Sequence, residues 1–512
     1  MKTTYFKLLI LFMVFTVSCD EDFLERPPLT APNSGTFYKD EVAATMAVTG
    51  VYNGLYDMAH LHQWEDALTD NERWYLDGGT ALYGGLAHAL ETAVGNNPYH
   101  RRAWNRGYQI IQRANAAIEN IEPMTNISDD LKSRLIAECK FLRGWAYHFL
   151  IWRFGDVPLM LNPTSEQPYL PARTPKAEVV QQIYDDLSEA AEILPVKWTG
   201  ANIGRITKGA ALGFLAKEYL FNEDWENAET EAKKVMDILD YGLVENYEDL
   251  WTPGICNNTK EGLFEIQYWT SKGEFASELY YRWLKGEAAN TGASGQGWCM
   301  VVQDLVNAFE NIDGTPFDPT GIDLHTDDNQ YENRDPRLKI SIFCNGMDYF
   351  GQPFKRSWSE TDYGWRKYTI AKKDPLLISN TNAPYNWKML RYAEVLLIYA
   401  EAKNETDGPV AEVYDAVNAV RNRAGMPDLP DDLSQDEMRE RIYNERRVEL
   451  CSEGTRLEDL IRWRRLKEVM EKKHFNQGVN YQIVTFDEFR YLWPIPQQEI
   501  DVNPNLEQND GY

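Results

Sequence analysis

The 512-residue sequence predicts a mainly α-helical protein in which a scaffold of helical hairpins brackets a loop-rich insert with a few short strands. Two stretches of chain, about residues 36–240 and 385–470, carry apolar residues at alternating steps of three and four, the spacing of a buried helix face. Between them, from about 241 to 384, this period lapses and turn residues become frequent. We therefore expect one domain over residues 19–512, closed by a framework segment at 471–512.

Two long helices are predicted between residues 128 and 195. Ser128 is placed to cap the first, and Thr174-Pro175 opens the second, which ends before Pro195. The apolar stripe of the first is Leu131, Leu135, Cys139, Leu142, Ala146 and Phe149, and that of the second is Val180, Ile183, Leu187, Ala191 and Leu194.

A helical hairpin follows, formed by "TKGAALGFLAKEYLF" and "DWENAETEAKKVMDIL". Only about three residues separate the two segments, and small alanines stand where the helices must approach, which is typical of a tetratricopeptide-like hairpin. The inward positions are Leu212, Leu215 and Tyr219 on the first helix and Trp225, Ala228, Ala232, Val235 and Leu239 on the second.

A second hairpin is predicted near the C-terminus. The segment "NWKMLRYAEVLLIYAEA", with Met389 and Leu396 facing inward, is followed after Gly408-Pro409 by "VAEVYDAVNAVRNRAG". Gly425 then ends this last helix, as a residue that readily adopts a left-handed backbone.

The insert carries β-like runs such as "LFEIQYW" and "RLKISIF" between clusters of Gly, Asn, Asp and Pro. Asp313, Asp318 and Asp323 stand in such a cluster, but their spacing differs from a calcium-binding loop, so we expect an acidic surface loop. Because binding residues concentrate in loops that a rigid scaffold positions, the insert is where we expect the ligand.

The charge of the chain argues against a nucleic-acid partner. Its formal net charge is −27, and removal of residues 1–18 with their two lysines leaves −29. Arginines are dense over residues 439–473, but eleven Lys or Arg are interleaved there with eight Asp or Glu. Such mixing indicates ion pairs within and between helices rather than a binding patch.

The amino terminus has the pattern of an export signal. Lys2 and Lys7 precede an apolar run from Leu8 to Val17, which is shorter than the about 20 residues that a membrane-spanning helix needs. The run ends at Cys19, as in a bacterial lipoprotein signal whose cysteine is acylated, although Thr16 and Val17 depart from the usual pattern. We expect residues 1–18 to be the signal peptide and Cys19 the lipidated residue.

Five cysteines remain after Cys19, an odd number without the short spacing of a metal or redox motif. Their pairing stays open, except that the position of Cys139 on an apolar helical stripe predicts a buried thiol. The five are Cys139, Cys256, Cys299, Cys344 and Cys451.

Seven stretches, in order along the chain, resemble the SusD-like (RagB/SusD) outer-membrane lipoproteins of the Bacteroidetes. They are "SCDEDFLERPP", "AECKFLRGWAYHFLIWRFGDVPL", "GRITKGAALGFLAKEYL", "LRYAEVLLIYAEA", "VNAVRNRAG", "NERRVELCSEGTRLEDLIRW" and "LWPIPQQEIDVNPNLEQNDGY". Together they span residues 18–512, and the closing stretch is the most specific of them.

This resemblance implies four tetratricopeptide-like hairpins and a lipid-anchored protein at the outer face of the outer membrane. It also implies a lid on a SusC-like, TonB-dependent transporter that captures oligosaccharide or polysaccharide and passes it inward, without catalysis and without a cofactor. The framework stretches would place Trp145, Trp152, Trp463 and Trp493 in the core.

Sugar recognition needs exposed aromatic faces with amide, carboxylate or guanidinium groups around them. Residues 261–300 hold eight aromatics, and from them we single out Trp298, Trp283 and Tyr281. A second candidate place lies among turn residues at 70–85 and just beyond, with Trp74, Arg73, Tyr75 and Asn96. A third aromatic cluster, "YFGQPFKRSW" at 349–358, is a weaker candidate.

Two other functions stay open from the sequence. Some relatives in the resembled family take peptides, so an oligopeptide-binding lid is one alternative. A secreted glycoside hydrolase is the other, because two suitably spaced carboxylates suffice for that reaction and the chain has 79 acidic residues. No phosphate loop, nucleophile elbow or zincin motif is present, and His60 with His62 lacks a matched third metal ligand.

Overall fold

The computed structural model describes residues 37–74, 95–162, 170–268, 299–349, 351–369, 385–476, 479–482 and 486–512. Long helices dominate these ranges, as the sequence predicts. They are α3 (Glu41–Glu65), α5 (Pro98–Ile121), α6 (Asp129–Phe154), α7 (Lys176–Ile193), α8 (Lys208–Phe221), α9 (Trp225–Met236), α13 (Tyr392–Asp407), α14 (Ala411–Arg423) and α15 (Gln435–Glu449). None of the helices described is long and apolar enough to cross a membrane.

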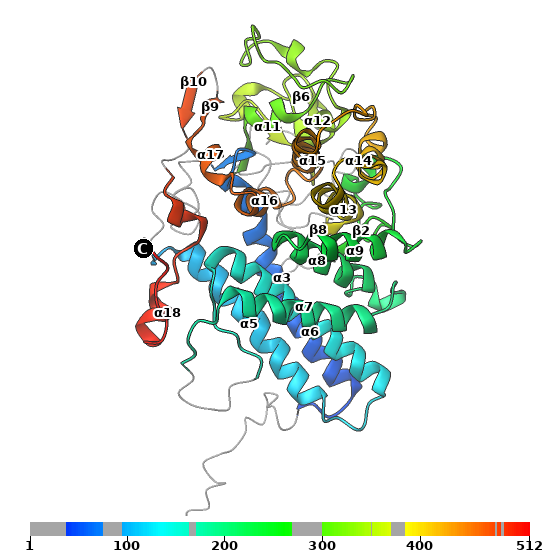
Figure 1. The fold of residues 1–512 in the computed structure, drawn as a ribbon, viewed down its shortest axis with the longest axis vertical. Helices are drawn as coiled ribbons and strands as arrows, with labels where there is room; N and C mark the ends of the chain where they lie inside the picture. Colours follow the sequence, from blue (N-terminus) through cyan, green and yellow to red (C-terminus); the bar gives the residue numbers. More distant parts are fainter. Residues whose placement is uncertain are drawn as a thin grey trace, which may run out of the picture.

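Helices adjacent in sequence pack side by side (Figure 1). The α3, α5, α6 and α7 helices form the lower part of the view, and α8, α9 and α13 lie above them. The irregular segments around α11 and α12 gather at the opposite end from α5 and α6. The mainly α-helical fold is therefore confirmed.

Helix boundaries follow local capping chemistry. The Ser128 hydroxyl accepts a hydrogen bond from the Leu131 amide (3.3 Å) at the start of α6. At the start of α15, Ser434 and Glu437 each cap the other's backbone amide. Gly425 has φ +82° after α14, as expected of a residue that ends a helix in the left-handed region.

The α8–α9 hairpin forms as predicted, with one position wrong. Its turn places Glu223 at φ +59°, and Ala228, Ala232 and Val235 of α9 are buried. Leu239, however, is 99% exposed. The reason is that α9 ends at Met236, so the helical period no longer carries Leu239 to the inner face.

The predicted helix beginning at Asn386 starts later than expected. Residues Trp387–Arg391 form strand β8, antiparallel to β2 (Gly262–Ile266), and α13 begins only at Tyr392. Met389 is buried as predicted, but in a strand. The run "RLKISIF" was expected to be β-like throughout, yet Arg337–Ser341 is helical because Asp335 caps the turn that Pro336 opens.

The remaining elements are short. The helices are α11 (Gln303–Ala308), α12 (Pro336–Ser341), α16 (Arg456–Arg462), α17 (Leu466–Glu471) and α18 (Gln497–Val502). The strands form two-stranded antiparallel pairs: β1 (Glu72–Trp74) with β3 (Cys299–Val301), β4 (Ile342–Phe343) with β7 (Gly364–Trp365), β5 (Asp348–Tyr349) with β6 (Gln352–Pro353), and β9 (Lys473–Asn476) with β10 (Val479–Gln482).

The core holds most of the side chains that the framework resemblance placed there. Trp145, Trp152 and Trp493 are buried, whereas Trp463 is half-buried and stacks on Tyr443. Five cysteines among the described residues, Cys139 among them, are buried and form no disulfide, so the open question of their pairing is answered.

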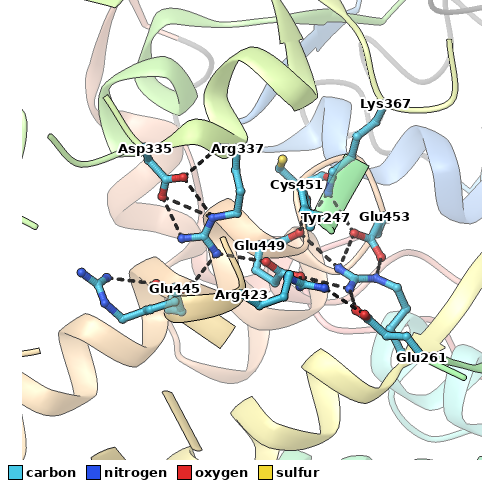
Figure 2. A network of polar contacts seen from close by, with 12 residues as sticks. Tyr247, Glu261, Asp335, Arg337, Lys367, Arg423, Glu445, Glu449, Cys451 and Glu453 are labelled. Atoms are coloured by element: carbon cyan, nitrogen blue, oxygen red, sulfur yellow. Dashed lines mark hydrogen bonds and ion pairs between the residues drawn. The ribbon is translucent and has the colours of Figure 1, made fainter. Parts of the chain in front are cut away.

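A network of buried ion pairs joins the insert to the C-terminal helices (Figure 2). The fully buried Glu449 of α15 accepts hydrogen bonds from Arg337 of α12 (3.0 Å), Arg391 of β8 (3.0 Å) and Arg423 of α14. Arg391 also binds Glu453 at both carboxylate oxygens (2.7 and 2.8 Å). Many of the interleaved charges of residues 439–473 thus form ion pairs within the protein, as their mixing indicated.

We predict that Arg391→Met lowers the free energy of unfolding by about 3–5 kcal/mol, because it leaves the buried carboxylates of Glu449 and Glu453 short of a counter-charge. The matched control is Lys234→Met, which removes an exposed ion pair with Glu231 and should cost less than about 1 kcal/mol. Urea denaturation of both variants measures the difference, and similar losses would contradict the structural importance of this network.

Candidate functional site

Strands β1 and β3 bring the two sequence-predicted binding segments together. Arg73 pairs with Met300 and Trp74 with Cys299 in an antiparallel register. Residue 75 directly follows Trp74 and residue 298 directly precedes Cys299, so both candidate segments are connected to the same end of this ladder. Segments more than two hundred residues apart thereby share one anchoring point.

Only some of the predicted site residues lie within the described part of the chain. Arg73 and Trp74 lie in β1, where the structure describes their backbone only. Asn96 is exposed, next to the residue Gly95 whose carbonyl accepts a hydrogen bond from the Gln497 amide of α18 (2.8 Å). The others, Cys19 included, lie outside the described residues: Tyr75, Tyr281, Trp283 and Trp298.

Two arginines, Arg447 of α15 and Arg456 of α16, form a clamp on the chain that leads into β1. Arg456 binds both carboxylate oxygens of Asp70 (2.9 and 3.0 Å), and Arg447 donates to the Asp70 carbonyl (2.9 Å) and to the side chain of Asn71 (2.8 Å). Burial would raise the pKa of Asp70, but the charges of Arg447 and Arg456 outweigh it and hold that pKa well below its usual range. Asp70 is therefore a carboxylate at neutral pH.

Two further buried acids, Asp66 and Glu72, lie next to the clamp and have raised pKa values. Burial raises the pKa of Asp66 to about 7, although the Gly454 and Arg456 amides donate to its carboxyl group. Burial also raises the pKa of Glu72 well above its ordinary value, and the nearby Asp66 adds to this effect. Both shifts disfavour the charged form of a carboxyl group in this buried region.

Sequence reasoning predicted the ion pairing of residues 439–473 but missed that Arg447 and Arg456 hold the binding segment. Nothing in the local pattern could have shown it, because Asp70 and Arg447 lie 377 residues apart in the chain.

Two aromatic groups that the sequence offered as candidates belong to the core. Tyr349, Phe354 and Trp358 are buried and pack on one another with ring centroids 5.5–6.0 Å apart, so the cluster at 349–358 is not an exposed platform. Phe264, from the aromatic-rich segment 261–300, is buried against Phe141 in an edge-to-face contact of 5.3 Å.

A hollow of about 310 Å³ lies beside the start of the candidate segment 261–300 and has no counterpart in the sequence predictions. Its lining includes Tyr52, Asn53 and Tyr56 of α3 together with Arg205 and Gln267. The ring of Tyr56 packs on Tyr268 at 5.0 Å. Aromatic faces beside amide groups suit a sugar ring, but the residues come from separate elements and share no sequence pattern.

One described group, His62, Glu65 and Glu458, comes close enough together to hold a metal ion. Arg153 already donates to both carboxylates (2.6 Å to Glu65 and 3.2 Å to Glu458), and Lys217 lies 3.1 Å from Glu458. The cluster is therefore neutralised by side-chain cations. Burial lowers the pKa of His62 to about 3, so its imidazole adds no further charge.

Comparisons with known proteins bear on both halves of the chain. A model of the SusD family matches residues 260–512, and a model described as starch-binding associating with outer membrane matches residues 29–220. The chain is 25% identical to SusD-like protein P25 of Formosa agariphila over 98% of both proteins, and 29% identical to SusD-like protein P2 of the same organism over 80% of both.

The fold is also similar to solved structures. A SusD-like carbohydrate binding protein from Bacteroides fragilis superposes with a TM-score of 0.83 at 27% identity, covering 92% of this chain and all of that one.

We predict that Asp70→Asn destabilises the protein at pH 7 and that its effect shrinks in acid. The folded-state pKa of Asp70 is depressed, so its stabilising contribution is fully present above the ordinary carboxyl pKa of about 4 and is lost only as the pH falls from there through the depressed folded-state pKa. Denaturant midpoints of wild type and variant at pH 7, 5 and 3 should differ less at pH 3 than at pH 7. A constant gap between the two proteins would show that the ion pair with Arg447 and Arg456 is not its source.

Proposed function

Because the chain belongs to the SusD-like family, we propose that it is a cell-surface lipoprotein that binds oligosaccharide or polysaccharide and delivers it to a SusC-like, TonB-dependent outer-membrane transporter. The observation that carries this proposal is the β1–β3 ladder, which anchors two aromatic-rich segments at one place on a helical scaffold. The match to a starch-binding, outer-membrane-associated model over residues 29–220 supports the ligand class and the location.

The proposed mechanism is capture without chemical change. Aromatic rings of the segments that continue from Trp74 and Cys299 stack on the C–H faces of sugar rings, and neighbouring polar groups take hydroxyls in pairs. Trp298, Trp283 and Tyr281 from one segment, and Arg73, Trp74, Tyr75 and Asn96 from the other, are the residues that we propose for this role. The Arg447 and Arg456 clamp holds the base of the second segment in place.

We propose that the anchor is a lipid on Cys19 after removal of residues 1–18. The acidic residues Asp20, Glu21 and Asp22 would then follow the acylated end directly. Such an anchor places the protein at the membrane surface without a spanning helix.

We predict that Trp298→Ala abolishes retardation in affinity electrophoresis on a polysaccharide panel while the melting temperature stays nearly unchanged. The control is Trp358→Ala, whose buried ring fills the core, so that its loss should cost about 3–5 kcal/mol of stability. A large fall in the melting temperature of Trp298→Ala would make that residue part of the core.

The same panel separates the alternative functions. No retardation on any polysaccharide, together with thermal stabilisation by peptide mixtures, would favour an oligopeptide-binding lid. Release of sugar products from a retained polysaccharide would favour a glycoside hydrolase. The proposal requires retardation of the protein and an unchanged polysaccharide.

We predict that metabolic labelling with a fatty-acid analogue marks the wild-type protein and not Cys19→Ala, because the thiol of Cys19 is the attachment point for the lipid. The variant should also leave the membrane fraction. Equal labelling of the two proteins would remove the lipid anchor from the proposed function.

A further inference from the structure

A cavity of about 700 Å³ lies away from the β1–β3 ladder and is within the volume range of small-molecule sites. Its walls come from the end of α6, the start of α7, the α8–α9 turn, the end of α16 and the C-terminal segment from Glu488 to Asp510. The wall combines apolar side chains such as Phe221 and Leu492 with several charged groups. No residue of β1 or β3 contributes to it.

Lys176, in the first turn of α7, is a cation of this wall without a carboxylate partner. Its ammonium nitrogen lies 3.1 Å from the ring centroid of Trp152, and no carboxylate among the described residues forms an ion pair with it. Burial lowers the pKa of Lys176 to about 8, although the more distant Glu218 and Asp156 act in the opposite direction. An anion supplied by a ligand would stabilise a half-buried ammonium group that has no carboxylate partner.

Arg464 is the second such cation. Its backbone adopts φ +58°, and its guanidinium group lies 5.0 Å from the ring of Tyr491 with no ion pair to a described carboxylate. Its charge is close enough to contribute to the lowered pKa of Lys176. Two cations without an ion pair among the described residues thus line the same cavity.

The nearby carboxylates are engaged elsewhere. Asp156 accepts a hydrogen bond from the Lys176 backbone amide (2.8 Å), Glu488 pairs with Lys467 (3.2 Å), and Glu218 binds His148.

The other acids of the lining are exposed. Burial lowers the pKa of Arg173, and the charges of Glu507 and Asp510, which lie in the C-terminal segment of the wall, act against this shift. Glu223 lies in the α8–α9 turn. Solvent therefore screens these carboxylates more than it screens the half-buried ammonium group of Lys176.

We propose that this cavity binds an oxyanion between Lys176 and Arg464, and that the oxyanion is carried by a sugar, as in a uronic acid. The cavity volume far exceeds that of a free inorganic anion, and the apolar wall beside the two cations suits the C–H face of a sugar ring. The ion pair with Lys176 and Arg464 would supply charge-assisted hydrogen bonds to the carboxylate. This site does not depend on the function proposed for the β1–β3 ladder.

Calorimetric titration of the mature chain at pH 7 with three probes tests the inference: methyl β-glucuronide, methyl β-glucoside and sodium sulfate. We expect binding of the glucuronide, weaker binding of sulfate and none of the neutral glucoside. Binding of sulfate without binding of the glucuronide would contradict the proposal that the oxyanion is carried by a sugar. Equal binding of glucuronide and glucoside, or no heat from any probe, would overturn the oxyanion site itself.

Variants locate the binding. Arg464→Gln and Lys176→Gln should each weaken glucuronide binding by about tenfold or more, because each removes a hydrogen bond to a charged group. The control Lys234→Gln, an exposed lysine of α9 outside the cavity, should bind like wild type. Because Arg464 is exposed, its variant separates loss of binding from loss of folding.

The pH dependence of glucuronide binding distinguishes a direct role in binding from a purely structural role. Since the pKa of Lys176 is about 8, raising the pH from 7 to 9 should weaken wild-type glucuronide binding roughly tenfold. Lys176→Gln should lose most of this dependence, while Arg464→Gln should keep it. Unchanged binding in both variants, or a pH profile that neither alters, would contradict the assignment.

Discussion

The burial of one carboxylate, that of Glu449, sets the constraint on which the arrangement of the chain depends. Its desolvation is costly unless several cations surround it, and Arg337, Arg391 and Arg423 come from three different elements to do so. Their charges outweigh the effect of burial and hold the pKa of Glu449 well below its usual range. Movement of α12, β8 or α14 away from α15 would therefore remove a counter-charge from this buried carboxylate.

Helix α15, which carries Glu449, connects the buried ion-pair network to the proposed binding site. Glu449 and Arg447 are neighbours on α15, so the element that is fixed by the buried network also presents the guanidinium group that binds Asp70 and Asn71. Arg456, at the start of α16, adds the second half of the clamp. A rigid helical framework thus ends in a fixed base for the two candidate binding segments, which can differ in sequence without disturbing the scaffold.

The sequence predicts those parts of the fold that local chemistry decides. Ser128 and the apolar stripe of α6 suffice for that helix, because capping and burial act within a few residues. The errors arise where tertiary contacts decide. Residues 387–391 are compatible with a helix but pair with β2 instead, and Leu239 is exposed because α9 ends early. The clamp on Asp70 joins residues far apart in sequence, so no local pattern encodes it.

Aromatic density alone does not identify a sugar site in this chain. Tyr349, Phe354 and Trp358 form a dense cluster, yet they pack on one another in the core. What distinguishes the segments continuing from Trp74 and Cys299 is their common anchoring point on the scaffold. Charge adds a second criterion. A chain with a net charge of −27 repels anions at long range, so stacking suits neutral sugars, whereas an acidic sugar needs a local pair of cations such as Lys176 and Arg464.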